Sequence, residues 1–209
     1  LDALGDGVLL LPTAPETARN SDVLHEYRPG SDFAFLTGFP EPEAVLLAWR
    51  TAPGRHHATL FVRPRDPVRE VWDGKRHGVR GAQREFGVDD AFPIAELWSK
   101  LPTLMAPHRR LFHRLGVDAE FDRRLLAAFA AFAKKHRRRA LAAHPAIEDP
   151  LPVLATMRLV KDAAELGAMR RAAAITAAGH RAAMAAARPG VTEYEVQAAL
   201  EAEFRRGGS

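Results

Sequence analysis

The chain has 209 residues, 47% of them hydrophobic and 27% charged, which is ordinary for a globular protein with one sizeable core. Its 30 Lys and Arg exceed its 26 Asp and Glu by too little to indicate nucleic-acid binding without a concentrated basic patch. The absence of cysteine excludes disulfides, thiolate metal sites and cysteine nucleophiles. No apolar run approaches the length of a membrane span. We therefore expect a cytoplasmic protein without a membrane partner.

The first third of the chain predicts strands separated by breaker-rich segments. Residues 7–12 form an apolar run closed by proline, as expected for a strand buried on both faces, and the polar residues 13–25 are predicted as loop. Residues 28–44 contain three Phe and several Pro, too many breakers for one helix, and predict a buried crossover packed by aromatic rings. Residues 44–49 and 56–63 predict two strands whose short connection indicates an antiparallel hairpin.

The middle of the chain predicts alternating helices and strands. Residues 65–80 are charged and irregular, and Trp72 stands there between an acidic and a basic pair. Apolar periodicity and end signals predict the remaining elements, which are helices over 81–86, 94–105 and 118–136, the last capped by Asp118 or Asp122, and a strand over 110–115. This alternation up to about residue 142 predicts an α/β domain.

The character of the sequence changes after residue 145. Residues 145–152 are rich in proline and acidic side chains, which is typical of the approach to a linker. Capping boxes at Asp162 and Thr192 predict two helices, ending near residues 187 and 206. The stripe expected to pack the first of these helices against a neighbour consists of Leu166, Met169, Ala173, Thr176, His180, Ala183 and Ala187. The two helices either fold back on the first domain or begin a second one.

Motifs of known chemistry are largely absent from the sequence. The nine His are scattered without a His-Glu-x-x-His pattern, and neither Gly-x-Ser-x-Gly nor Gly-x-Gly-x-x-Gly occurs where it is needed. The basic run at residues 134–139 is explained by a helix C-terminus, although an acidic partner or nucleic acid would also fit it. Trp72 is explained most simply as a core residue or hydrophobic anchor, and in a charged loop also as a lid or interface residue.

Several segments together identify a family. They are Arg19-Asn20-Ser21-Asp22, Tyr27-Arg28-Pro29-Gly30-Ser31-Asp32-Phe33, Leu36-Thr37-Gly38-Phe39-Pro40-Glu41-Pro42-Glu43-Ala44, Glu70-Val71-Trp72-Asp73-Gly74, Met157-Arg158-Leu159-Val160-Lys161 with Glu165, and Arg188-Pro189-Gly190. In order and spacing they closely resemble aminopeptidase P, the Xaa-Pro aminopeptidase of the creatinase and prolidase superfamily. The resemblance implies a creatinase-like N-terminal α/β domain at residues 1–155, with a mixed central sheet flanked by helices. Residues 156–209 would be the linker and first helices of an incomplete pita-bread catalytic domain.

The same resemblance implies a function for the complete protein. It would be an oligomeric metallopeptidase, dimeric or tetrameric, that uses two divalent metals, usually manganese, to release an N-terminal residue that precedes proline in a peptide. Two metals can activate a bridging hydroxide and polarise the scissile carbonyl. The family's Asp, His and Glu ligand motifs do not occur in this sequence. We therefore assign no metal ligand and no catalytic residue to this chain, and we expect it to be inactive alone.

The resemblance also directs attention to candidate interface residues. In this family the N-terminal domain helps to build oligomers and presents loops to a neighbouring subunit's active site. Trp72, Arg76 and Arg138 are accordingly predicted as substrate-pocket or interface residues. An alternative function is a non-catalytic binding module of the same fold, and nucleic-acid binding through the basic run is the weakest hypothesis.

Overall fold

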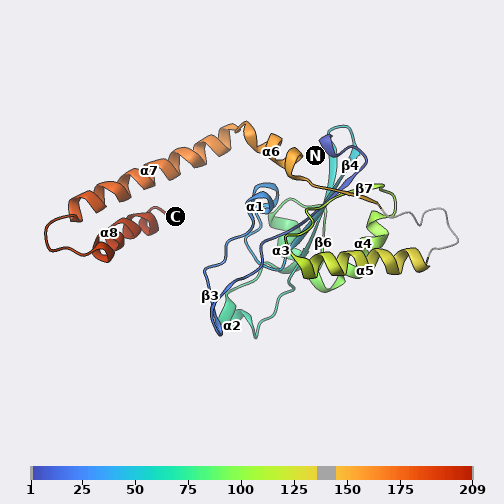
Figure 1. Cartoon of the computed structure of the whole chain (residues 1–209), viewed down its shortest axis with the longest axis horizontal. Helices are drawn as coiled ribbons and strands as arrows, with labels where there is room; N and C mark the ends of the chain where they lie inside the picture. The colour runs from blue at the N-terminus through green and yellow to red at the C-terminus, as the bar shows by residue number, and fades with distance from the viewer. Residues whose placement is uncertain (1, 136–144, 209) are drawn as a thin grey trace. The chain divides into compact units, whose positions relative to one another are not determined.

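The computed structural model describes residues 2–135 and 145–208 (Figure 1). The chain divides into two compact units, Leu1–Ala155 and Thr156–Ser209. The first unit is a mixed α/β domain and the second is a helical hairpin, and each is described by itself.

The first unit is built on a six-stranded sheet with the order β6-β5-β4-β1-β7-β8. β4 pairs antiparallel with both β1 and β5, whereas β1–β7, β7–β8 and β5–β6 are parallel pairs. All strands except β4 therefore end at the same edge of the sheet, called the carboxyl edge below. The strands are β1 Val8–Pro12, β4 Val45–Ala52, β5 Arg55–Val62, β6 Asp90–Pro93, β7 Arg110–Phe112 and β8 Ala146–Glu148.

Helices cover the sheet because its strands are apolar on both faces. On one face Val8, Leu47 and Phe61 form a core with residues of α4 and α5, including Leu101 and Leu125, all with exposed fractions of 0%. On the opposite side α3 contacts β5 and β6. The helical segments of this unit are η1 Asp2–Leu4, α1 Ser31–Thr37, α2 Glu70–Asp73, α3 Gly78–Glu85, η2 Ile94–Glu96, α4 Leu97–Met105, α5 Ala119–Lys135 and α6 Leu151–Leu159, which continues into the second unit.

The segment between β1 and β4 differs from its prediction. Residues expected to be loop form a small hairpin, β2 Ala18–Asn20 with β3 Val23–Leu24. The crossover at residues 28–44 contains the seven-residue helix α1, which its breakers delimit: Gly30 precedes its first residue, and Gly38 ends it in the left-handed conformation at φ 63°. Phe33 and Phe39 are fully buried, so the predicted aromatic packing is correct for them.

Two short strands were not anticipated from the sequence. β6 has four residues and β8 has three, too few to display the alternation that reveals a strand. β8 lies in the stretch interpreted as the approach to a linker, so the sheet extends further along the chain than predicted. The hairpin of β4 and β5 is confirmed, with Leu47 opposite Thr59.

Asp118 and Asp122 have separate roles at the start of α5. Asp118 Oδ1 caps the helix by accepting hydrogen bonds from the backbone N–H groups of Glu120 and Phe121, each at 3.0 Å. Asp122 accepts from Gly116 N at 2.7 Å and lies 3.0 Å from Nε2 of the buried His113. Burial opposes ionisation of Asp122, but these hydrogen bonds outweigh it and hold its pKa below the ordinary value.

The second unit packs α7 (Ala163–Ala186) against α8 (Glu193–Arg206). Asp162 and Glu165 form the predicted capping box, with both reciprocal hydrogen bonds at 2.8 Å. The predicted packing stripe is wrong, because Leu166 and Met169 are 40% and 54% exposed. Gly179 is instead the buried residue of α7, where its missing side chain admits Phe204 of α8. The close approach of α8 to Gly179 therefore decides which face of α7 packs against α8.

We expect Asp122→Asn to lower the free energy of unfolding at pH 7 by about 1–3 kcal/mol, because it weakens charged hydrogen bonds to His113 and Gly116. A carboxyl group with a lowered folded-state pKa stabilises the fold above its unfolded-state pKa, and this stability is lost as pH falls through the folded value. The difference from the parent, measured by urea unfolding, should therefore shrink below about pH 4. Glu120→Gln, which removes an exposed ion pair with Arg123, is the control and should change little.

Substitution of two glycines on α7 should have unequal effects. A Cβ at Gly179 would lie 2.5 Å from Phe204 Cε1, whereas one at Gly167 meets only Arg171 Nη1 at 3.7 Å. Both Gly→Ala changes gain about 1 kcal/mol of helix propensity. Overpacking should make Gly179→Ala less stable than Gly167→Ala by about 1–3 kcal/mol, measured from thermal unfolding by circular dichroism. Equal stabilities would show that α8 moves freely away from α7.

Candidate functional site

The loops at the carboxyl edge of the sheet form the candidate site. In open sheets of this type ligand sites commonly lie beyond the carboxyl ends of the strands, where the connecting loops meet. Two of the cavities at this edge contain charged side chains. An apolar cleft of about 390 Å³ lies beyond β1 and β6. A charged cavity of about 530 Å³ is lined by Glu16, Leu24, His25, Tyr27, residues 40–43, Arg63, Arg69 and residues 73–76.

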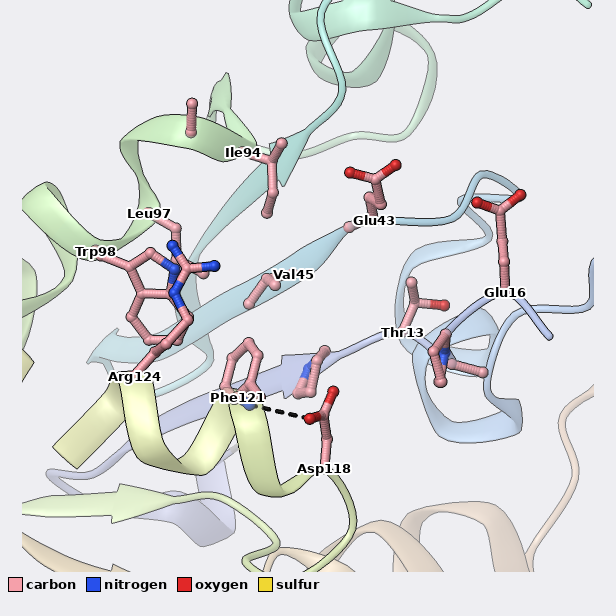
Figure 2. A pocket seen from close by; sticks show the side chains of 15 residues that line it. Thr13, Glu16, Glu43, Val45, Ile94, Leu97, Trp98, Asp118, Phe121 and Arg124 are labelled. Carbon is pink, nitrogen blue, oxygen red and sulfur yellow. Dashed lines mark hydrogen bonds between the residues drawn. The ribbon is translucent and has the colours of Figure 1, made fainter. Parts of the chain in front are cut away.

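The apolar cleft has an aromatic wall and an acidic end (Figure 2). Val45 and Phe121 line it, and the Arg124 guanidinium stands over the Trp98 ring at 4.9 Å from the ring centroid. Glu16 and Glu43 extend from the far side. This combination can accommodate an apolar group.

The second feature of this edge is the Trp72 loop, defined here as residues 65–77, which follows β5 and contains the single-turn helix α2. Its outer side exposes Val68, Val71 and Trp72, with exposed fractions of 77%, 78% and 88%. Its inner side lines the charged cavity opposite residues 24–27. A loop that exposes three apolar side chains within five residues is typical of a surface that binds another molecule.

Glu70 connects the parts of the Trp72 loop. Its carboxylate accepts two hydrogen bonds from the Arg65 guanidinium, from Nε at 2.5 Å and Nη2 at 2.6 Å, and one from Asp66 N at 3.1 Å. The hydrogen bonds from Arg65, assisted by the one from Asp66 N, hold the pKa of Glu70 below its ordinary value.

Glu41 and Arg76 place buried charges beside the charged cavity. Glu41 is 9% exposed, and its Oε1 accepts a hydrogen bond from His77 N at 2.6 Å. Arg76 is 8% exposed, and its Nη2 donates to Asp73 Oδ2 at 3.0 Å. Glu41 Oε2 and Arg76 Nε have no hydrogen-bond partner among the described residues. Each of these two buried charged groups thus has one side-chain atom without a hydrogen bond. This is unusual for residues with a purely structural role, because burial of a charge is costly unless the charge is fully hydrogen-bonded.

The three site residues predicted from the sequence differ in their exposure to solvent and in whether the structure describes them. Trp72 and Arg76 share one loop, but Trp72 projects into solvent whereas Arg76 is buried. Arg138 falls within residues 136–144 and so lies outside the described residues. Sequence reasoning noticed Glu41 and Glu70 only as parts of family motifs and gave neither a role. The available signal was the dense charge of residues 65–80, which does not reveal which carboxylate braces the backbone.

Among residues 2–135 and 145–208, no three His, Asp or Glu side chains are grouped so that they could hold a metal ion. The described residues therefore do not fit a dinuclear metal centre, and no metal-dependent step is assigned to them. Within the same ranges no helix combines the length and apolarity needed to cross a bilayer.

Comparison with known proteins identifies the family. Residues 1–112 match the family model for the aminopeptidase P N-terminal domain, and residues 167–209 match that of metallopeptidase family M24. The chain belongs to the aminopeptidase P N-terminal domain family. It is 37% identical to the Xaa-Pro aminopeptidase of Escherichia coli over 96% of this chain and 45% of that protein. The resemblance found in the sequence is thereby confirmed.

Solved structures show the same relationship. The Pseudomonas aeruginosa aminopeptidase PepP superposes with a TM-score of 0.87 at 44% identity, covering 98% of this chain and 46% of that one. A zinc-substituted E. coli aminopeptidase P in complex with product gives a TM-score of 0.90 at 36% identity, with 97% and 46% covered. The predicted mixed α/β fold is confirmed. The chain spans slightly less than half the length of these relatives.

Proposed function

We propose that this chain is the N-terminal portion of a manganese-dependent Xaa-Pro aminopeptidase, which hydrolyses the bond between an N-terminal residue and proline. Support comes from the Xaa-Pro aminopeptidase relatives, each about twice as long as the chain. Proline supplies no N–H and has a fixed ring, so this bond requires a dedicated enzyme. In this proposal the complete protein is a cytoplasmic homo-oligomer, dimeric or tetrameric, that acts on proline-containing peptides.

The two units have different roles in the proposal. Residues 1–155 form the creatinase-like domain, which serves oligomerisation and shapes the active site. Residues 156–209 form the linker and first helices of the pita-bread catalytic domain, in agreement with the M24 match at residues 167–209. The exposed Leu159, Val160, Met169 and Met184 on the helical unit support this, because a larger domain would cover such side chains.

The Trp72 loop is the part of this chain with the most direct proposed role. Trp72 is 88% exposed, and this exposure is the observation that carries the assignment. Large aromatic side chains that are exposed in one subunit commonly anchor an interface. We assign Trp72 to contact with a neighbouring subunit beside its active site, and Arg76 and Arg138 to the same region.

The metal requirement can be tested by chelation. We expect the complete protein to lose Xaa-Pro hydrolysis when its divalent metals are removed and to regain it on addition of Mn²⁺, because metal ions would activate the attacking water. The 209-residue chain should be inactive with or without Mn²⁺. Peptide hydrolysis by this chain, or full activity of the metal-free complete protein, would contradict the proposal.

Trp72→Ala in the complete protein should lower kcat/KM for a Xaa-Pro peptide by about tenfold or more, as expected when an interface anchor is removed. Oligomer size, measured by light scattering, should decrease if the side chain also holds subunits together. Val117→Ala removes another exposed apolar side chain, 72% exposed, from a different loop of the same edge and is the control. If neither activity nor oligomer size changes in Trp72→Ala, the assignment of Trp72 is wrong.

A further inference from the structure

The Trp72 loop is closed at its base by a close approach of its two ends. Gly78, the residue after the loop, has φ +62°, and a Cβ built on it would lie 2.7 Å from Arg65 Cγ and 3.2 Å from Arg65 N. Glycine is therefore needed at this position both for its conformation and for the contact. A surface loop of this length with adjoining ends is an Ω-loop, a form that is frequently functional.

Glu70 braces the incoming leg of the loop from inside. It accepts hydrogen bonds there from the Arg65 side chain and from Asp66 N. Its own side chain is only 9% exposed. Asp66 Oδ1 adds a turn by accepting from Val68 N and Arg69 N, each at 3.2 Å. These two carboxylates thus fix the backbone that leads into Val71 and Trp72.

Glu41 holds the end of the loop to the rest of the domain. It lies in the turn before β4, and its carboxylate accepts from His77 N at 2.6 Å. The His77 ring in turn contacts Phe86 edge-on at a centroid distance of 4.9 Å, and Phe39 contacts the same ring of Phe86 at 5.0 Å. The last residue of the loop is therefore anchored on buried aromatic packing as well as on a charged hydrogen bond.

We propose that Glu70 is a positioning residue, supported by Glu41, that fixes Trp72 in place before it meets its partner. This inference rests on the proposed function of Trp72 and names what that function requires. An unbraced loop would lose conformational freedom on binding, which reduces affinity, whereas a braced loop has already lost it. Glu70 acts through Trp72 and does not itself contact substrate.

Hydrogen exchange of the complete protein tests the bracing. In Glu70→Gln we expect the backbone amide of Asp66 to exchange about tenfold faster or more, since the charged hydrogen bond that holds it is weakened. Glu120→Gln is the matched control, because Glu120 accepts the same pair of Nε and Nη2 hydrogen bonds from Arg123 on α5. Unchanged exchange at Asp66 in Glu70→Gln would overturn the proposal.

A charge swap separates backbone bracing from a simple ion pair. The double variant Arg65→Glu with Glu70→Arg keeps opposite charges in contact but removes the carboxylate that accepts from the backbone N–H of Asp66. We expect its exchange to remain as fast as that of Glu70→Gln. Recovery of parental exchange in the swap would show that an ion pair suffices and would overturn the assignment of Glu70 as a backbone brace.

Kinetics of a double variant test whether Glu70 acts through Trp72. If it does, Glu70→Gln lowers kcat/KM for a Xaa-Pro peptide, and Trp72→Ala with Glu70→Gln is no slower than Trp72→Ala alone. Multiplied effects of the two changes would overturn the positioning role. A Trp72→Ala variant with parental activity would instead remove the proposed function of Trp72, while hydrogen exchange would still decide whether Glu70 braces the loop.

Discussion

The direction of the strands is the constraint on which the rest of this structure depends. β4 alone runs against the others, so the loops that follow β1, β5, β6 and β7 all leave the sheet at one edge. That edge therefore carries the apolar cleft, the charged cavity and the Trp72 loop. Because both faces of the sheet are covered by helices, this edge is where variation in sequence can change what the domain binds without disturbing its core.

The sequence predicted the parts of the fold whose signal is local and repeated. The β4–β5 hairpin has two long apolar runs and a Pro-Gly turn, and the capping box at Asp162 is encoded within four residues. The strands β6 and β8 were not predicted, because their few residues form strands only through pairing with β5 and β7. The face of α7 that packs against α8 was predicted wrongly for a related reason. Hydrophobicity favoured Leu166 and Met169, whereas the fit of Phe204 against Gly179 can be seen only in the three-dimensional structure.

The candidate site could be located but not explained from the sequence. Family motifs drew attention to Trp72 and Arg76, yet nothing in the pattern shows that one is exposed and the other buried. Glu41 belongs to the crossover that seemed to serve packing alone. The structure gives that crossover a second role, because the same few residues supply Phe39 to the core and the Glu41 carboxylate to the end of the Trp72 loop.

Loop bracing and aromatic exposure are best understood together. Three exposed apolar side chains on a flexible loop would tend to fold onto the nearest apolar surface, and the wall of a neighbouring cleft would be available to them. The hydrogen bonds of Glu70, Asp66 and Glu41 instead bind the inner side of the loop by its backbone and charges, and Gly78 closes its base. Trp72 then has no route inward without breaking charged hydrogen bonds. The polar interior of the loop is thus the physical reason that its apolar exterior remains available to a partner.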